Sequence, residues 1–470
     1  MKPTWTAALL FAATPFVFGQ SQAPTVHGPN ESDARLLVQA AKVSAMQVKD
    51  EFLREQLLDE IGALQARLRE YDSAVLTAKA AYPHTLKTLT ALGRQLADDP
   101  VALNRVAARL KPDEASTVLA NVVWAQADKG NIEIAIRTSK RVTAPEVRSD
   151  ALRALAIRQS AAGDFTGARK SLAEASAVDP VQKTSPEEEI ELIANGQLSR
   201  GDKDAAHKSI EGIGSGEMKA AVLIAGADSL NKAGDRSTAR AWLLEALNSL
   251  PKTSEDAFIP YMAIPVQVEL GELESAMRFA DSLSGDMRTK VYGAIAVSCA
   301  EQKDEKGIQA ALAKMKTVKS SPGHDVDVAT FAEQLQLLNV SAALVDNGQF
   351  KTATDLLDYL EANLDGVGKT MLTRTIQLQR ALMLAQQGDF ASSAELAMKI
   401  PADSITDIQR GTALRSIALL ETKARGAAVT RPWAEALRDP EDHAYACLGI
   451  AQALLGIDDT NLPYSSFQVH

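Results

Sequence analysis

A short turn signal recurs along this chain of 470 residues. It consists of a glycine followed by a polar residue, and it returns every 32 to 45 residues, with lysine replacing glycine in one occurrence. A repeat of this length is typical of a solenoid, in which each unit packs only on its neighbours. The eight signals are Gly130-Asn131, Gly163-Asp164, Gly201-Asp202, Gly234-Asp235, Gly271-Glu272, Lys303-Asp304, Gly348-Gln349 and Gly388-Asp389.

The residues around each signal predict a helical hairpin. An Ala-rich stretch of about four turns precedes it, and a small or apolar residue stands four places after the polar one. Glycine can take the left-handed conformation that ends the first helix, and the polar residue can cap the second. The predicted contact residues of the second helices are Ala135, Ala168, Ala206, Ala239, Ala276, Ile308 and Ala353, and Ala394 comes one place late after the last signal.

The composition agrees with an all-α chain. Hydrophobic residues make up 46% of the sequence but aromatic residues only 5%, and Ala and Leu, which favour helices, dominate the apolar content. Ser185-Pro186-Glu187-Glu188 predicts a capping box at the start of one helix. Pro260 and Pro265 predict a kink or a split in another. Cys299 and Cys447 are expected to be small buried residues too far apart for a disulfide.

Two of the units carry the fullest version of the pattern. Residues 151–180, with Gly163-Asp164-Phe165, and residues 221–251, with Gly234-Asp235, resemble tetratricopeptide repeats, and the pattern continues more loosely over residues 101–400. The resemblance implies a right-handed superhelical α-α solenoid of TPR-like helical hairpins whose first helices line the concave face. Polar or aromatic residues expected to project there are Trp124, Arg153, Glu191, Asn195, Asp228, Asn231 and Tyr261.

The chain divides into seven segments on this interpretation. Tyr71-Asp72 and Ala97-Asp98 are candidate turn signals of two degenerate early repeats, and Asp442–Leu455 is expected to be a C-terminal cap. The segments are a signal peptide (1–19), a loose leader (20–32), N-terminal helices and degenerate repeats (33–100), TPR-like repeats (101–315), a long loop (316–325), further repeats with C-terminal capping helices (326–456) and a tail (457–470).

The first nineteen residues have the parts of a secretory signal. Lys2 is followed by an apolar run from Ala7 to Ala13 and by a small-residue exit, for which cleavage after Gly19 is preferred and cleavage after Ala23 is the alternative. The apolar run is too short to span a membrane. We therefore expect a periplasmic or secreted protein.

The charge and the motifs exclude several classes of function. A net charge of −10 disfavours a general nucleic-acid binder, which needs a basic surface. Asp365–Thr370 has the sequence of the end of a phosphate-binding loop, but Asn363 stands where the motif needs glycine. The six histidines show no metal-ligand spacing, and no nucleophile has a local base. We expect no cofactor, no metal and no catalytic residue.

The main functional hypothesis is an exported, non-catalytic scaffold that binds a protein or peptide partner on its concave face. An alternative is an enzyme subunit that grips a cell-envelope polymer, which requires converging carboxylates and shifted pKa values at Glu191, Asp228 and their neighbours. A second alternative is a structural spacer. The sequence specifies neither the partner nor the oligomeric state.

Overall fold

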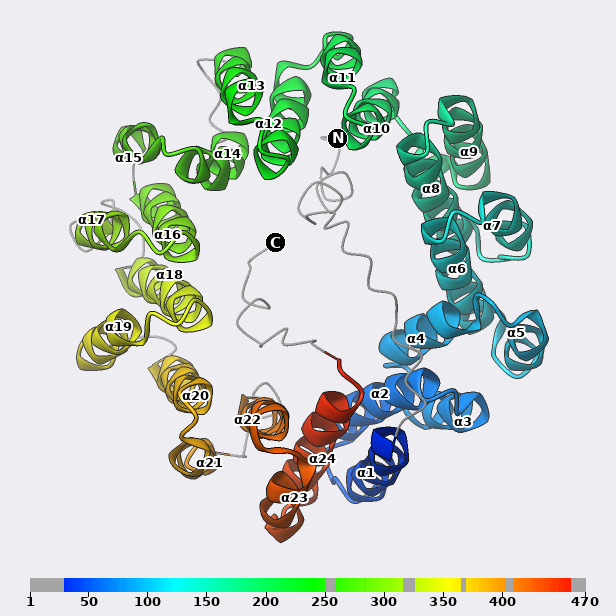
Figure 1. Ribbon diagram of the computed structural model, residues 1–470, viewed down its shortest axis with the longest axis vertical. Helices are drawn as coiled ribbons and strands as arrows, with labels where there is room; N and C mark the ends of the chain where they lie inside the picture. The colour runs from blue at the N-terminus through cyan, green and yellow to red at the C-terminus, as the bar shows by residue number, and fades with distance from the viewer. Residues whose placement is uncertain are drawn as a thin grey trace. The chain divides into compact units, whose positions relative to one another are not determined.

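The computed structural model describes residues 29–250, 258–283, 285–315, 326–364, 369–401 and 409–457. These residues form 24 α-helices and one short 3-10 helix, and no strand occurs among them (Figure 1). The first half contains α1 (Pro29–Ala45), α2 (Glu51–Arg67), α3 (Tyr71–Ala80), α4 (Leu86–Leu96), α5 (Pro100–Ala107), α6 (Pro112–Asp128), α7 (Ile132–Ser139), α8 (Pro145–Ala161), α9 (Phe165–Val178), α10 (Pro186–Ser199), α11 (Lys203–Ile210) and α12 (Gly216–Lys232). The second half contains α13 (Arg236–Ser249), α14 (Phe258–Glu269), α15 (Leu273–Ser282), α16 (Gly285–Glu301), α17 (Glu305–Met315), α18 (Val326–Asp346), α19 (Phe350–Ala362), α20 (Lys369–Gln386), α21 (Phe390–Met398), α22 (Gln409–Arg425), α23 (Ala427–Ala436) and α24 (Pro440–Leu454). The predicted all-α class is confirmed.

Several sequence predictions fall outside the described residues. These are the signal peptide (1–19), the long loop (316–325), Asp365–Gly368 of the phosphate-loop-like segment, and the tail except for Ile457. Of the leader expected over residues 20–32, residues 20–28 also lie outside the described residues, whereas residues 29–32 belong to α1, which begins at Pro29.

The turn signals end their helices as predicted. All seven glycines have φ between 73° and 87°, and Lys303, which replaces glycine in the sixth signal, has φ 59°. A side chain in this region of φ is strained, which explains why glycine recurs there. The prediction of an early signal at Tyr71-Asp72 is wrong by two residues: Arg69 takes the positive φ, 61°, and α3 begins at Tyr71. The sequence does not reveal this turn, because arginine stands where the other turns have glycine.

The second helices bury the residue predicted to contact the first helix. All seven such side chains from Ala135 to Ala353 are fully buried. After the last signal the position is filled by Ser393 rather than by the late Ala394, because the buried Ser393 hydroxyl donates a hydrogen bond to the Ala381 carbonyl at 2.6 Å.

A polar bond that the sequence analysis missed also recurs within the hairpins. A glutamine stands four residues before the positive-φ residue, and its Oε1 accepts a hydrogen bond from a Ser or Thr hydroxyl twelve residues later on the second helix. The pairs are Gln65–Thr77, Gln126–Thr138, Gln159–Ser171 and Gln197–Ser209, at 2.7 to 2.8 Å. The first three pairs are buried, and paired buried polar groups fix the register of two helices, since a shift would leave both groups unsatisfied.

Other local predictions are also settled. Ser185 and Glu188 form the predicted capping box, with hydrogen bonds of 3.1 and 2.9 Å. Both cysteines are free and buried, as expected, and burial raises the pKa of each thiol to about 12. α14 is not split: it is helical throughout, with Pro260 in its first turn and Pro265 inside it.

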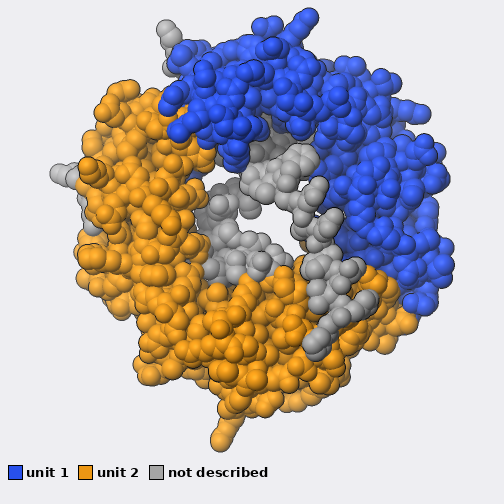
Figure 2. All heavy atoms as spheres, viewed as in Figure 1, with its two compact units in different colours: residues 1–27, 89–262 blue, residues 28–88, 263–470 orange. Residues whose placement is uncertain are grey.

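The helices form two compact units, which Figure 2 colours separately. Unit 1 contains Leu89–Met262, and unit 2 contains Gly28–Thr88 together with Ala263–His470. One boundary lies within α4 and the other within α14. The chain therefore starts and ends its described part in the same unit.

In unit 2, α1 and α24, the first and last of the described helices, pack along each other. The contact between α1 and α24 is as extensive as the contact within the hairpins α8–α9 and α12–α13 (Figure 1). From the sequence, α24 is expected to be a C-terminal cap, and α1 falls at the start of the N-terminal helices, with no contact predicted between them. In the structure each covers the apolar face of the other instead.

Candidate binding face

Unit 1 places its first helices side by side. α6 contacts α8, α8 contacts α10, and α10 contacts α12, whereas the second helices α7, α9 and α11 mainly contact first helices. Unit 1 is thus more tightly packed on the side of its first helices, and Figure 1 shows them on the inner side of this unit. This arrangement matches the expectation that first helices line the concave face.

The recurring glycine defines equivalent positions on these four helices. The residue six places before it is Trp124 in α6, Ile157 in α8, Asn195 in α10 and Asp228 in α12. These side chains point away from the buried face of each helix: Trp124 and Asn195 are exposed, and Ile157 and Asp228 are half-buried. We call these four residues the inner row.

Three of the seven predicted site residues lie in the inner row, and three others lie one turn before an equivalent position. Arg153, Glu191 and Tyr261 each stand ten places before their glycine, so they flank the row on the same face. Asn231 stands three places before Gly234 and is half-buried; seven residues separate it from the α12 position equivalent to Arg153 and Glu191, so it lies on the same side of its helix. The register therefore places all seven on the same side of their own helices, six of them on α6, α8, α10 and α12 and Tyr261 on α14.

Arg153 is held by the protein itself. Its guanidinium donates a hydrogen bond to the Gln182 carbonyl and lies 3.9 Å from the Glu188 carboxylate. Its side chain is only 16% exposed. Arg153 therefore ties α8 to the start of α10, and the positive charge that it offers to a ligand is partly neutralised.

Glu191 is the perturbed group on this face. Burial, and then the negative charge of Glu188, raise its pKa to about 7. Glu188 is committed to the capping box, and Asp228 lies on another helix, where it pairs with Lys232 at 2.7 Å. The shifted pKa that the enzyme hypothesis expects is present at Glu191, but the paired carboxylates that it requires are not brought together.

A pH series on Glu191→Gln tests this environment. The folded pKa lies above the unfolded value of 4.5, so ionisation disfavours the fold: the cost is absent below pH 4.5 and complete above pH 7. We expect Glu191→Gln to match the unchanged protein near pH 4 and to exceed its unfolding free energy by about 2 kcal/mol near pH 8. Glu187→Gln, one turn earlier, serves as the control. A constant difference across the series would contradict the assignment.

Metal binding and membrane insertion find no support in the part of the chain that the structure describes. No group of three or more His, Cys, Asp and Glu side chains lies together there in a way that could hold a metal ion. No helix there is both long and apolar enough to cross a membrane. Of the histidines within this part, His207 contacts Glu245 at 2.7 Å and His443 contacts Ser44 at 2.8 Å.

Comparisons with known proteins do not identify a family or a function for this chain. No protein-family model and no curated protein matches the sequence. Three solved structures that match are the human IFIT1 dimer with PPP-AAAA (14% identity, 93% of each chain, TM-score 0.25), the APC/C hetero-tetramer Cut9-Hcn1 (11%, 91% of this chain and 97% of that chain, 0.20) and a circular tandem repeat protein with a novel repeat topology (16%, 87% and 84%, 0.17). At these TM-scores the likeness carries no functional assignment. The helical-repeat fold rests on the hairpins and turns of the chain itself.

Proposed function

We propose that this protein is a scaffold that binds a peptide segment of a partner protein across the inner row of unit 1. The observation that carries the proposal is the row itself: four equivalent positions on adjacent first helices present an indole, an aliphatic side chain, an amide and a carboxylate. Packed helices lie 8–10 Å apart, so the row spans roughly 30 Å, or about nine residues of extended peptide.

The charge of these helices indicates what kind of peptide fits. Together α6, α8, α10 and α12 carry eleven acidic and five basic side chains, a net of −6, and α10 alone carries four acidic and none that is basic. Trp124 and Ile157 lie at one end of the row, and Asn195 and Asp228 at the other. We therefore expect a peptide with an apolar residue over α6 and α8 and a basic residue over α10 and α12.

Selection from a random peptide library on the immobilised protein tests the proposal. Peptides with net positive charge and an aromatic or aliphatic anchor should be enriched. Trp124→Ala should weaken their binding at least tenfold, since buried aromatic anchors contribute about 2 kcal/mol or more. Leu244→Ala, at a residue of α13 that is 62% exposed, should leave the affinity unchanged. Enrichment of acidic peptides, or equal effects of the two substitutions, would refute the inner row as the site.

Photo-crosslinking then identifies the natural partner. Photoreactive residues at Asn195 and Asp228 should capture one recurrent protein from the cell, and the same residue at Ile134 or Leu244 on the second helices should not. Adducts that form only at the control positions would show that binding uses the opposite face.

We further propose that the chain is exported, because residues 1–19 have the parts of a secretory signal. N-terminal sequencing of the protein from its own cells should begin at Gln20, or at Pro24 if the alternative site is used. A chain that still begins at Met1 would contradict export through this segment.

A further inference from the structure

α24 has the features of a first helix. Gln452 is buried and precedes the positive-φ Gly456 by four residues, and the amide of Ile457 donates to the Gln452 carbonyl at 3.0 Å. The same turn ends α6, where the Asn131 amide donates to the Gln126 carbonyl at 2.9 Å. A helix of this type requires a second helix against its apolar face.

α1 occupies that position. On one side Asp33 lies 3.4 Å from Arg431 of α23, and on the other Lys42 donates to Thr77 of α3 at 2.8 Å. Both α23 and α3 are second helices of their own hairpins, with α22 and α2. α1 therefore stands between two second helices, and the α24–α1 pair is a hairpin assembled from the two ends of the described part of the chain.

The interface between α1 and α24 combines close apolar packing with a specific polar contact. Small side chains recur at helical spacing on both partners, Ala34 and Ala41 on α1 and Ala444 and Ala451 on α24, and all four are buried in one apolar cluster. Ser44 and His443 form a 2.8 Å hydrogen bond across the interface. Apolar burial thus supplies the attraction, and the polar contacts at the edges select the register.

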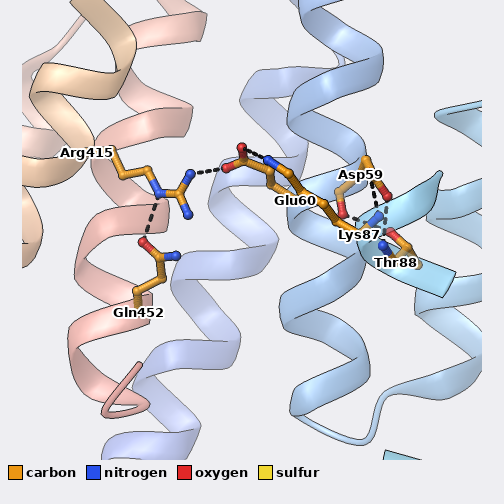
Figure 3. Close-up of polar contacts among 6 residues, drawn as sticks. All are labelled: Asp59, Glu60, Lys87, Thr88, Arg415 and Gln452. Atoms are coloured by element: carbon orange, nitrogen blue, oxygen red, sulfur yellow. Dashed lines mark hydrogen bonds and ion pairs between the residues drawn. The ribbon is translucent and has the colours of Figure 1, made fainter. Parts of the chain in front are cut away.

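The remaining contacts hold α2 to the same assembly. Arg415 of α22 forms an ion pair with Glu60 of α2 and donates to Gln452 Oε1 of α24 at 2.8 Å (Figure 3). Lys87 also reaches Glu60, at 2.7 Å. α22, α24 and α2 are therefore linked by contacts that do not involve α1.

Among the described residues, α1 is covalently joined to the other helices only through the short segment that leads to α2. It shares less surface with α2 than with α24, and Gln47 and Lys49 in the connection are exposed. We infer that the face of α24 between α23 and α3 is a helix-binding site, which α1 fills in cis and which an α1 helix from a second copy of this chain can fill in trans. This inference is independent of the inner row.

The test uses the full chain with a specific protease site inserted between Val48 and Lys49. After folding and cleavage, the N-terminal fragment should remain in the main peak on gel filtration. A labelled peptide of residues 29–48 should then replace it over time, because a lone helix of this length is held by its packing rather than by its own stability.

Two variant peptides test whether the exchange depends on the buried face of α1. Val38 is 1% exposed and Val43 is 52% exposed. The Val43→Asp peptide should therefore exchange like the unchanged one, whereas the Val38→Asp peptide should bind at least 100-fold more weakly. Immediate loss of the fragment after cleavage, a fragment that stays but never exchanges, or equal binding of both variants would each overturn the inference.

Discussion

Replacing Val38 by aspartate is expected to open the contact between α1 and α24. Val38 is 1% exposed and belongs to the apolar cluster that joins the two helices. A carboxylate there is either buried without a partner or must leave the interface, at a cost of about 3 kcal/mol or more. Such a cost corresponds to a loss of hydrogen-exchange protection of roughly 100-fold for the amides of α1 and α24.

Val43→Asp is the matched control for this experiment. It places the same charge five residues later on the exposed side of α1, where it should change protection less than threefold. The helices of unit 1 should be unaffected by either substitution, because repeat units draw their stability mainly from their neighbours. Equal effects of the two variants would mean that α1 does not pack on α24 as the structure shows.

The second large effect is expected at the Glu60–Arg415 ion pair. Burial raises the pKa of Glu60, but Arg415 and Lys87 outweigh it and hold this pKa below its ordinary value. The side chains of Glu60 and Arg415 are 14% and 22% exposed, whereas that of Lys87 is 62% exposed. Arg415→Met should therefore cost about 2–3 kcal/mol at pH 7, and Lys87→Met less than about 1 kcal/mol.

The stabilisation by the Glu60–Arg415 pair is expected to depend on pH. A carboxyl whose folded pKa is lowered stabilises the fold above its unfolded pKa and loses that contribution as the pH falls through the folded value. The difference between the unchanged protein and Arg415→Met should thus shrink below about pH 4. Urea unfolding at pH 7 and below pH 4 measures this difference in unfolding free energy. Hydrogen exchange then shows whether the amides of α2 and α24 lose protection. A double-mutant cycle with Glu60→Gln should give a coupling of about 1 kcal/mol or more, and additivity would refute the pair.

The local structure of the hairpins could be predicted from the sequence because its causes are local. Gly163 and Asp164 end one helix and start the next within two residues, and Ser185 and Glu188 cap a helix within one turn. The turn at Arg69 carries no such signal, because a residue other than glycine takes the positive φ there. The hydrogen bonds between Gln and Ser or Thr do have a signal in the sequence, a spacing of twelve residues such as that from Gln159 to Ser171. This spacing can be interpreted only when the positions of both helices are known.

The pairing of α1 with α24 could not be predicted in the same way. The apolar pattern of α1 shows that one of its faces is buried but does not say against which helix. Ser44 and His443 are 399 residues apart, and Glu60 and Arg415 are 355 apart, so no local rule connects them. The proposed binding face is predictable only in part. The glycine register places Trp124 and Asn195 on one face, whereas the hydrogen bond from Arg153 to the Gln182 carbonyl depends on the fold of the loop.

Thiol cross-linking of α1 to α24 tests the central claim most directly. With Cys299 and Cys447 replaced by alanine, the pair Ser44→Cys and His443→Cys should form an intramolecular disulfide under mild oxidation, because these side chains lie in hydrogen-bond contact. Val43→Cys with His443→Cys, which places one thiol on the exposed side of α1, should not. A linked monomer from the first pair alone would confirm that α1 and α24 pair as one hairpin. Equal linkage of the two pairs, or none from the first, would contradict it.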